Sequence, residues 1–159
     1  GRRRLEPEPV DLAGTVRALA ATWRPLLARD HVALDVQTTA DATALADPTA
    51  LLRVLTNLLQ NALRHGHPAR AGLPRAIELR AGDGFVEVRD NGPGVPPAER
   101  ARIFERFARV HHDRPGVGLG LALSRELARA QQGDLTCDDD GVHTVFRLTL
   151  PTLPAQTEP

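Results

Sequence analysis

The most informative stretch of the sequence is residues 47–65, DPTALLRVLTNLLQNALRH. Asp47 followed by Pro48 predicts the start of a helix, because a carboxylate caps the first turn and proline is favoured just inside it. Apolar residues then recur at helical spacing and predict a buried face made of Leu51, Val54, Leu55, Leu58, Ala62 and Leu63. The pattern ends at Gly66-His67-Pro68. We therefore expect a helix over 48–65 with one face in a core.

The opposite face of this helix is polar in an unusual way. Arg53, Asn57, Asn61 and then Arg64 or His65 fall one turn apart, so they share a face. A solvated surface is the simplest interpretation, but Asn is a poor helix former and exposed positions normally carry Glu, Lys, Gln or Arg. Two asparagines one turn apart therefore favour a functional face. Their neutral carbonyl oxygens suit a hard cation such as Mg²⁺, which also binds phosphate oxygens.

A second motif, DNGPGV at 90–95, directly follows a stretch typical of a strand. Taken alone, its Asp, Asn, Gly and Pro residues favour a turn. The functional alternative is that Asp90 points a carboxylate into a pocket from the end of the strand, while the glycines let the backbone approach a ligand closely. Both interpretations stay open at this point.

A third motif, GVGLGL at 116–121, opens the last predicted helix, which covers about 119–131. Glycines before a helix leave free N–H groups at the positive end of the helix dipole, and this arrangement suits phosphate. The motif does not fit the dinucleotide-binding fingerprint, because no strand directly precedes it and no βαβ unit surrounds it.

Further helices flank these motifs. Asp11 is a suitable N-cap for a first helix, and Pro25 is expected to kink or end it. The apolar face of that helix comprises Leu12, Val16, Leu19, Trp23 and Leu26. Gly133 is expected to end the last helix. The apolar face of the last helix comprises Leu119, Leu123 and Leu127.

Short strands are expected at 32–36 and 44–46, and a short helix near 97–102. Two hairpins are predicted: 77–80 with 85–90 around a turn at 82–84, and 135–137 with 142–150 around 138–141. The order of these elements predicts an α+β fold. We expect a two-layer α/β sandwich, in which a mostly antiparallel mixed sheet carries helices on one face.

Composition limits the class of protein. The chain has 159 residues, which fits one compact domain, and 42% of them are hydrophobic, which is enough for a core. Its 20 basic residues are all Arg and balance 20 acidic ones, so the net charge argues against a general nucleic-acid or anionic-membrane binder. The single cysteine, Cys137, excludes an internal disulfide and a cysteine-rich metal site. No apolar run has membrane-spanning length.

The order, spacing and residues of the three motifs together resemble those of the Bergerat-type ATP-binding fold, the superfamily of gyrase, Hsp90, MutL and histidine kinases. Within it, VLTNLLQNALRH at 54–65 resembles the asparagine box of histidine kinases, DNGPGV the first glycine box, IFERF at 103–107 the phenylalanine box and GVGLGLALS at 116–124 the second glycine box. The opening VDL and the closing VFRLTLP are also similar to this family. The resemblance runs from about Leu5 to Pro151.

The resemblance implies roles for the polar face of the 48–65 helix. Asn61 would supply a side-chain oxygen to Mg²⁺, which bridges the ATP phosphates, and Asn57 would face the phosphates or the water shell of the metal. Arg64 takes the place of a family lysine that reaches the phosphates, and its planar fork delivers the charge with a different geometry. His65 stands where the family often has Tyr or His near the sugar and base.

The two glycine boxes supply the remaining ATP contacts that the resemblance implies. Asp90 would accept a hydrogen bond from the adenine amino group. The adenine pocket would be lined by Gly92, Gly94 and Val95. The phosphates would meet backbone N–H groups of Gly118, Leu119, Gly120 and Leu121. Thr144 is a further candidate near Asp90, although an ordinary strand position is the favoured interpretation.

The segment from about 96 to 116 corresponds to the ATP lid of the family. Its apolar anchors would be Ile103, Phe104 and Phe107. Arg106 and Arg109 are candidates to touch the γ-phosphate, with Arg109 preferred for its place after the phenylalanine box. A solvated surface is the alternative for both. Closure of such a lid is expected to need nucleotide or a partner domain.

Asn57 separates the branches of the superfamily. In the gyrase, Hsp90 and MutL branches, a Glu at this place acts as general base for water, and an amide cannot accept a proton usefully. Transfer to a protein is therefore favoured over hydrolysis.

None of the six histidines is followed by the acidic residue and basic-Ser/Thr-Pro stretch of a phosphoacceptor. His111-His112-Asp113 is interpreted as solvated, because no third metal ligand stands at suitable spacing.

The sequence thus predicts the ATP-binding catalytic domain of a sensor histidine kinase, with ATP and Mg²⁺ as its ligands. Its partners would be a separate dimerisation domain that carries the phosphoacceptor His, and a response regulator. An anti-sigma-factor-type serine kinase and a degenerate nucleotide-binding module of the same fold are the alternatives. Intact Asn61 and Asp90 count against the degenerate module.

The predicted organisation is a linker or edge strand at 1–9, the catalytic domain at 10–151 and a flexible tail at 152–159. Because the chain starts with Gly1 and not Met, we expect it to be a piece of a longer protein. The piece itself is expected to be a cytoplasmic monomer. The parent is expected to be a homodimer, and an anchor in the plasma membrane is compatible with the sequence.

Overall fold

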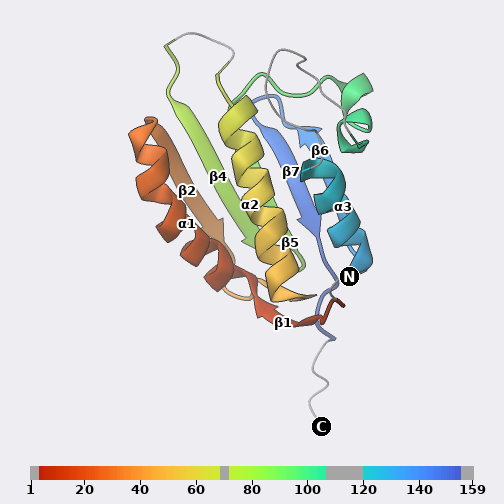
Figure 1. The fold of residues 1–159 in the computed structure, drawn as a ribbon. Helices are drawn as coiled ribbons and strands as arrows, with labels where there is room; N and C mark the ends of the chain where they lie inside the picture. The colour runs from red at the N-terminus through yellow and green to blue at the C-terminus, as the bar shows by residue number, and fades with distance from the viewer. Residues whose placement is uncertain (1–3, 69–71, 107–119, 155–159) are drawn as a thin grey trace.

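The computed structural model describes residues 4–68, 72–106 and 120–154, which form a two-layer α/β sandwich (Figure 1). The strands are β1 (Glu8–Asp11), β2 (Val32–Thr38), β3 (Thr43–Ala46), β4 (Arg75–Gly82), β5 (Phe85–Asp90), β6 (Asp134–Asp139) and β7 (Thr144–Thr149). The α-helices are α1 (Leu12–Arg29), α2 (Pro48–His65) and α3 (Gly120–Ala130). Short 3₁₀ helices cover η1 (Pro97–Glu99) and η2 (Arg102–Phe104).

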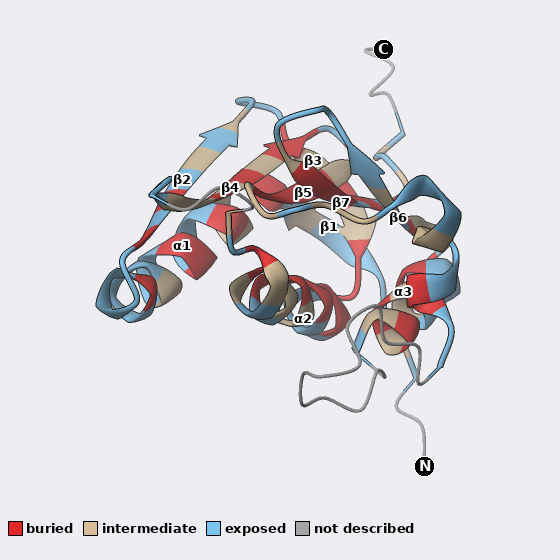
Figure 2. Ribbon diagram, turned by 90° about the horizontal axis from the view of Figure 1, so that it is seen from above, coloured by how far each residue is buried: buried red, intermediate tan, exposed pale blue. Residues whose placement is uncertain are grey.

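The larger sheet carries its strands in the order β2-β4-β5-β7-β6, while β1 pairs with β3 separately. β2 runs parallel to β4, whereas the β4–β5, β5–β7 and β6–β7 pairs are antiparallel. Helices α1, α2 and α3 lie on the same face of this sheet, and Figure 2 shows their buried residues turned towards it. The predicted fold class is therefore confirmed, as are both predicted hairpins. The short helix expected near 97–102 is replaced by η1 and η2.

The core lies between the helices and the face of the sheet that they cover. Helix α2 lies at the centre of the core. It starts where the sequence predicted: the Asp47 carboxylate accepts a hydrogen bond from the N–H of Ala50 (3.0 Å), and Pro48 stands in the first turn. The apolar face of α2 is buried as predicted, except that Leu63 is only partly buried. The sheet contributes alternate residues, among them Leu79, Val86 and Val88.

Helix α1 differs from the prediction in its second half. Asp11 caps it as expected, by accepting a hydrogen bond from the N–H of Gly14 (3.0 Å). Pro25 was expected to kink or end the helix, and an end there is wrong, because α1 continues to Arg29. Pro25 is exposed, as is Ala21, the residue whose carbonyl loses its donor. In the extra turn Leu27 reaches the core, and Leu26 is 46% exposed, contrary to the prediction.

Helix α3 buries small residues in place of the predicted leucine face. Its buried residues are Ala122, Ser124 and Ala128. Leu123 and Leu127 are only partly buried, and Leu119 lies outside the described residues. Small side chains on the buried face let α3 and α2 approach each other closely, and a leucine there would need a wider space.

The end of α3 at Gly133 has a different cause from the expected one. Gln132, and not Gly133, takes the left-handed conformation (φ 67°), and the N–H of Gly133 donates to the carbonyl of Ala128 (2.9 Å). Position 133 needs a glycine for steric reasons, because a Cβ there would lie 2.0 Å from the carbonyl oxygen of Thr149 on β7. Among the described residues, no helix is long and apolar enough to cross a membrane.

A buried aspartate joins the N-terminal segment to α2 through its carboxylate and to the end of α3 through its backbone N–H. The Asp47 side chain accepts hydrogen bonds from the N–H groups of Ala50 (3.0 Å) and Glu6 (2.8 Å). The N–H of Asp47 donates to Oε1 of Gln131 (2.6 Å), directly after α3. Asp47 is 1% exposed, so water cannot replace these partners easily.

Asp47→Ala is expected to lower the free energy of unfolding by about 3 kcal/mol, because it removes a helix cap and takes the acceptor from two N–H groups. Asp11→Ala is the matched control, since Asp11 is an exposed helix cap. Its expected loss is about 1 kcal/mol. Urea denaturation of both variants measures the difference. Equal losses would show that the buried junction adds no stability.

Candidate functional site

The polar face of α2 lies where the sequence predicted it. Asn57, Asn61 and His65 follow one another at one-turn spacing and are half-buried, whereas Arg64 is exposed. The side-chain amide of Asn57 donates a hydrogen bond to Oγ of Ser124 on α3 (3.1 Å). The structure therefore brings the asparagine face together with α3, the helix that the third motif, GVGLGL, opens.

Asp90 is the last residue of β5 and is 4% exposed. Because side chains alternate along a strand, Asp90 shares the helix-covered face with Val86 and Val88. Its Oδ1 accepts a hydrogen bond from the N–H of Gly92 (2.9 Å). Within the described residues, no donor is bonded to Oδ2. In the part of the chain that the structure describes, Oδ1 is thus the oxygen of this buried carboxylate that carries a hydrogen bond.

Burial raises the pKa of the Asp90 carboxyl above its usual value of 3.8, and the charge of Asp139 adds to this effect. The N–H of Gly92, then Arg75, then His143 oppose it. A buried carboxyl with a raised pKa is a frequent mark of a functional site. A ligand that donates a hydrogen bond to Asp90 would stabilise the ionised form.

Arg75, the first residue of β4, was missed by the sequence reasoning. Its Nη2 donates hydrogen bonds to the carbonyls of Ala62 (3.2 Å) and Leu63 (2.5 Å) in the last turn of α2. A cation is favourable at this negative end of a helix dipole. The contact ties the end of α2 to the sheet near Asp90. No local signal could identify Arg75, because its partners belong to a different element.

The glycines of the second motif allow close packing around Asp90. A Cβ at Gly92 would lie 2.8 Å from Oδ1 of Asp90 and 2.8 Å from the Cα of Gly66. Gly94 has φ 80°, and a Cβ there would lie 2.6 Å from Oδ2 of Asp139. Both glycines are therefore needed where they stand. Gly66, which the sequence marked only as the end of a helix, forms part of this packing.

Two neighbours of Asp90 complete the strand end. Asn91 accepts a hydrogen bond from the N–H of Ala76 (3.0 Å) and donates one to the carbonyl of Pro74 (2.8 Å). It thereby extends the β4–β5 pairing past Asp90, a role that its place in a turn motif did not predict. Thr144 of β7 stands opposite Asp90 in the register and is buried. Of the two interpretations of Thr144, the less favoured one, a position near Asp90, therefore agrees with the structure.

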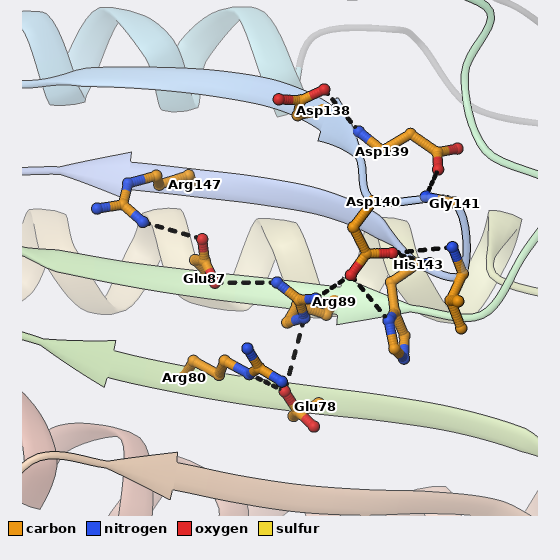
Figure 3. A network of polar contacts seen from close by, with 11 residues as sticks. Glu78, Arg80, Glu87, Arg89, Asp138, Asp139, Asp140, Gly141, His143 and Arg147 are labelled. Carbon is orange, nitrogen blue, oxygen red and sulfur yellow. Dashed lines mark hydrogen bonds and ion pairs between the residues drawn. The ribbon is translucent and has the colours of Figure 1, made fainter.

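The opposite face of the sheet carries a network of charges. Arg89 contacts the carboxylates of Glu78, Glu87 and Asp140 (Figure 3). Hydrogen bonds from the N–H groups of His143 (2.6 Å) and Val142 (2.9 Å) lower the pKa of the Asp140 carboxyl. The network thus fixes the β6–β7 turn to β5. Arg89 precedes Asp90 directly, so the same strand end is held from both faces.

The described part of the predicted lid is anchored by apolar contacts. Ile103 and Phe104 are buried, and the Phe104 ring meets Phe146 edge-on with centroids 6.3 Å apart. Arg106, a candidate for the γ-phosphate, forms an ion pair with Glu126 on α3 (2.7 Å). Both side chains of this pair are exposed, so it is a weak contact that a phosphate could replace.

The remaining predicted ATP contacts are less fully described. Val95 is half-buried, and its carbonyl accepts a hydrogen bond from Nε of Arg100 (3.2 Å). Gly120 opens α3 with open space where a Cβ would stand, and Leu121 is half-buried. Several predicted residues lie outside the described residues: Phe107, Arg109, His111, His112, Asp113, Gly116, Gly118 and Leu119. Their roles stay predictions.

The described residues contain no group of three His, Cys, Asp or Glu side chains that could hold a metal ion. The sequence predicts an amide oxygen as the protein ligand of a cation at this site. Mg²⁺ fits such a site, because it keeps several waters and usually takes one or two protein oxygens beside substrate phosphates. Asn61, half-buried on the polar face of α2, is the predicted donor.

The single cysteine lies on β6, beside the site. Cys137 is half-buried, and burial raises the pKa of its thiol to about 12. The charges of Asp90, Asp138 and Asp139 add to this effect, and Arg100 opposes it. Because the thiolate is the reactive form of cysteine, this thiol is not a nucleophile at neutral pH.

A buried carboxylate at a strand end, an asparagine face on the adjacent helix and closely packed glycines between them define a nucleotide-binding domain. Comparison with known proteins agrees with this class. Residues 46–154, more than half of the chain, match the family model described as histidine kinase-, DNA gyrase B-, and HSP90-like ATPase. The chain belongs to this family.

Similar proteins are sensor kinases. The signal transduction histidine-protein kinase AfsQ2 of Streptomyces coelicolor is 36% identical over 163 residues, which cover 98% of this chain and 28% of that protein. The mycobacterial sensor histidine kinase MprB has a structure with TM-score 0.71 and 31% identity, covering 94% of this chain and 99% of that one. Full-length ShkA in complex with AMPPNP gives TM-score 0.75 and 30% identity, covering 96% and 33%. The predicted resemblance to the catalytic domain of a sensor histidine kinase is confirmed.

Proposed function

We propose that this chain binds Mg-ATP and supplies the catalytic half of a sensor histidine kinase, which transfers the γ-phosphoryl group to a His on a separate dimerisation domain. The observation that carries the proposal is the amide of Asn57, which is bonded to Ser124 and lies one turn from Asn61. A carboxylate at this place would be a general base for water, whereas an amide is not. The site therefore favours transfer to a protein over hydrolysis.

Adenine recognition is assigned to Asp90. Its Oδ2, which has no donor among the described residues, accepts a hydrogen bond from the amino group of the base. Gly92 keeps this carboxylate in place for the base, because a Cβ at Gly92 would lie 2.8 Å from Oδ1 of Asp90. His65, at the end of α2, lies on the sugar side. The structure of ShkA with AMPPNP supports a nucleotide on this fold.

Phosphate binding is assigned to the polar face of α2 and the start of α3. Asn61 would hold Mg²⁺, Arg64 would add positive charge, and the N–H groups of residues 118–121 are the predicted contacts to phosphate oxygens. The metal would supply neutralisation of charge on the phosphates. The acceptor His attacks the γ-phosphorus, the bond to the bridging oxygen breaks, and ADP leaves. The chain acts by holding ATP in line for this attack.

The whole protein is a further part of the proposal, because this chain spans 28% of AfsQ2. We propose a homodimeric parent that joins through the dimerisation domain and passes its phosphoryl group to a response regulator. The names of AfsQ2 and MprB, a signal transduction kinase and a sensor kinase, support this role. A cytoplasmic location for this domain gives it access to ATP, and it is compatible with a membrane anchor elsewhere in the parent.

Phosphotransfer to the dimerisation domain of the same protein tests the proposal. The chain is incubated with γ-labelled ATP, Mg²⁺ and that domain, and we expect label that is lost in acid and kept in base, as phosphohistidine requires. The Asp90→Asn chain is the control and should transfer little label. Acid-stable label on a Ser of an antagonist protein would favour the serine-kinase alternative. Free phosphate without labelled protein would contradict kinase activity.

A further inference from the structure

Ser124 is a buried hydroxyl in α3. The side chain is fully buried, and its Oγ accepts a hydrogen bond from the amide nitrogen of Asn57 on α2 (3.1 Å). The two residues stand 67 positions apart in the sequence. One belongs to the helix that carries the proposed metal ligand, and the other to the helix that starts at the phosphate-binding glycines.

Packing alone does not explain a serine at this position. Ala128, one turn after Ser124 on the same face of α3, is also buried, so a small side chain is sufficient at this position. Alanine is the better helix former, and a buried hydroxyl costs stability unless it is hydrogen-bonded. The hydrogen bond with Asn57 on α2 therefore explains the hydroxyl of Ser124.

The hydrogen bond restricts the amide of Asn57. The terminal torsion of an asparagine side chain is broad, and its oxygen and nitrogen can exchange places at little cost. With Nδ2 bonded to Ser124, Oδ1 is the end of the amide that is left for a ligand. An oxygen in a fixed position suits the water shell of a cation, whereas an amide nitrogen in its place would repel it.

We propose that Ser124 is a positioning residue, which holds the Asn57 amide in the orientation that Mg-ATP requires and thereby links α3 to α2 at the phosphates. This inference rests on the proposed function, since it concerns the same site. Ser124 itself touches neither ATP nor metal in this scheme. Its effect on binding passes through Asn57, and that dependence can be measured.

A double-mutant cycle tests the dependence. The dissociation constant of Mg-ATP is measured for the unchanged chain, Ser124→Ala, Asn57→Ala and the double variant. Ser124→Ala is expected to weaken Mg-ATP by about 2- to 10-fold, the effect of one neutral hydrogen bond. In the Asn57→Ala background, the same substitution is expected to change nothing further, because its target is already gone. Equal weakening in both backgrounds would overturn the inference in favour of a packing role.

Three further measurements separate positioning from general damage. Ser124→Thr keeps the hydroxyl but adds a buried methyl group, so its affinity for Mg-ATP is expected to lie above that of Ser124→Ala, whereas an unchanged affinity of Ser124→Ala would overturn the inference. Thr22→Ala removes a helix hydroxyl from α1, far from the site, and is the matched control with unchanged affinity. Thermal unfolding shows that each variant is folded. Absence of Mg-ATP binding in the unchanged chain would instead reject the proposed function itself.

Discussion

Asp90→Asn is expected to weaken binding of ATP by about 10- to 100-fold, the effect of losing a hydrogen bond to a charged group. The asparagine keeps the shape of the side chain, and its oxygen can still accept the N–H of Gly92. The other end then presents an amide donor to the adenine amino group, which is also a donor. Isothermal titration with ATP measures the loss. An unchanged affinity would remove Asp90 from adenine recognition.

The same variant should gain stability, which separates a binding defect from unfolding. Burial raises the pKa of Asp90 above 3.8, so between 3.8 and the raised pKa the folded state binds more protons than the unfolded state. The contribution of Asp90 to the unfolding free energy therefore falls as pH rises through this window. Asp90→Asn does not titrate, and its advantage in urea denaturation should grow from acid to neutral pH. An Asp90→Asn chain that is less stable than the unchanged chain at pH 7 would contradict this assignment.

Asn61→Ala is expected to remove most of the Mg²⁺ dependence of ATP binding and to slow phosphotransfer by about 100-fold, because a bound metal contributes several kcal/mol of charge stabilisation. Asn61 is half-buried, and alanine is the better helix former, so the fold should persist. ATP affinity is measured with Mg²⁺ and with a chelator.

Gln60→Ala is the matched control for this prediction. Gln60 precedes Asn61 on α2 but is exposed, so its removal should leave both the affinity and the Mg²⁺ dependence unchanged. Tight binding of ATP that ignores both Mg²⁺ and Asn61 would reject the metal assignment, while leaving the adenine contact at Asp90 intact.

Local signals explain why much of the fold could be predicted. Asp47, Pro48 and the apolar spacing after them all act within one helix, and the bounds of α2 agree with the prediction. The hairpins likewise follow from turn residues between alternating strands. Pro25 shows the limit of such rules, since its position on the exposed side of α1 decides that the helix continues, and that side is set by tertiary packing.

The residues of the candidate site show the same difference between local signals and tertiary contacts. Asn57, Asn61 and Asp90 belong to motifs that are contiguous in the sequence, and the structure places them in the predicted helix and strand end. Arg75 and Ser124 were not found, because each acts through a partner on another element. A helix period shows which side chains share a face, but it does not show which residue of a distant helix that face meets.

The half-buried Cys137 has a practical consequence for observing this protein in motion. Burial raises the pKa of this thiol to about 12, so little of the reactive thiolate forms at neutral pH and maleimide reagents should modify it slowly. It is also the only cysteine in the chain. A cysteine introduced at an exposed position such as Leu52 would therefore take up a fluorophore or spin label selectively. The native sequence can serve as the background for distance measurements, with no thiol to remove first.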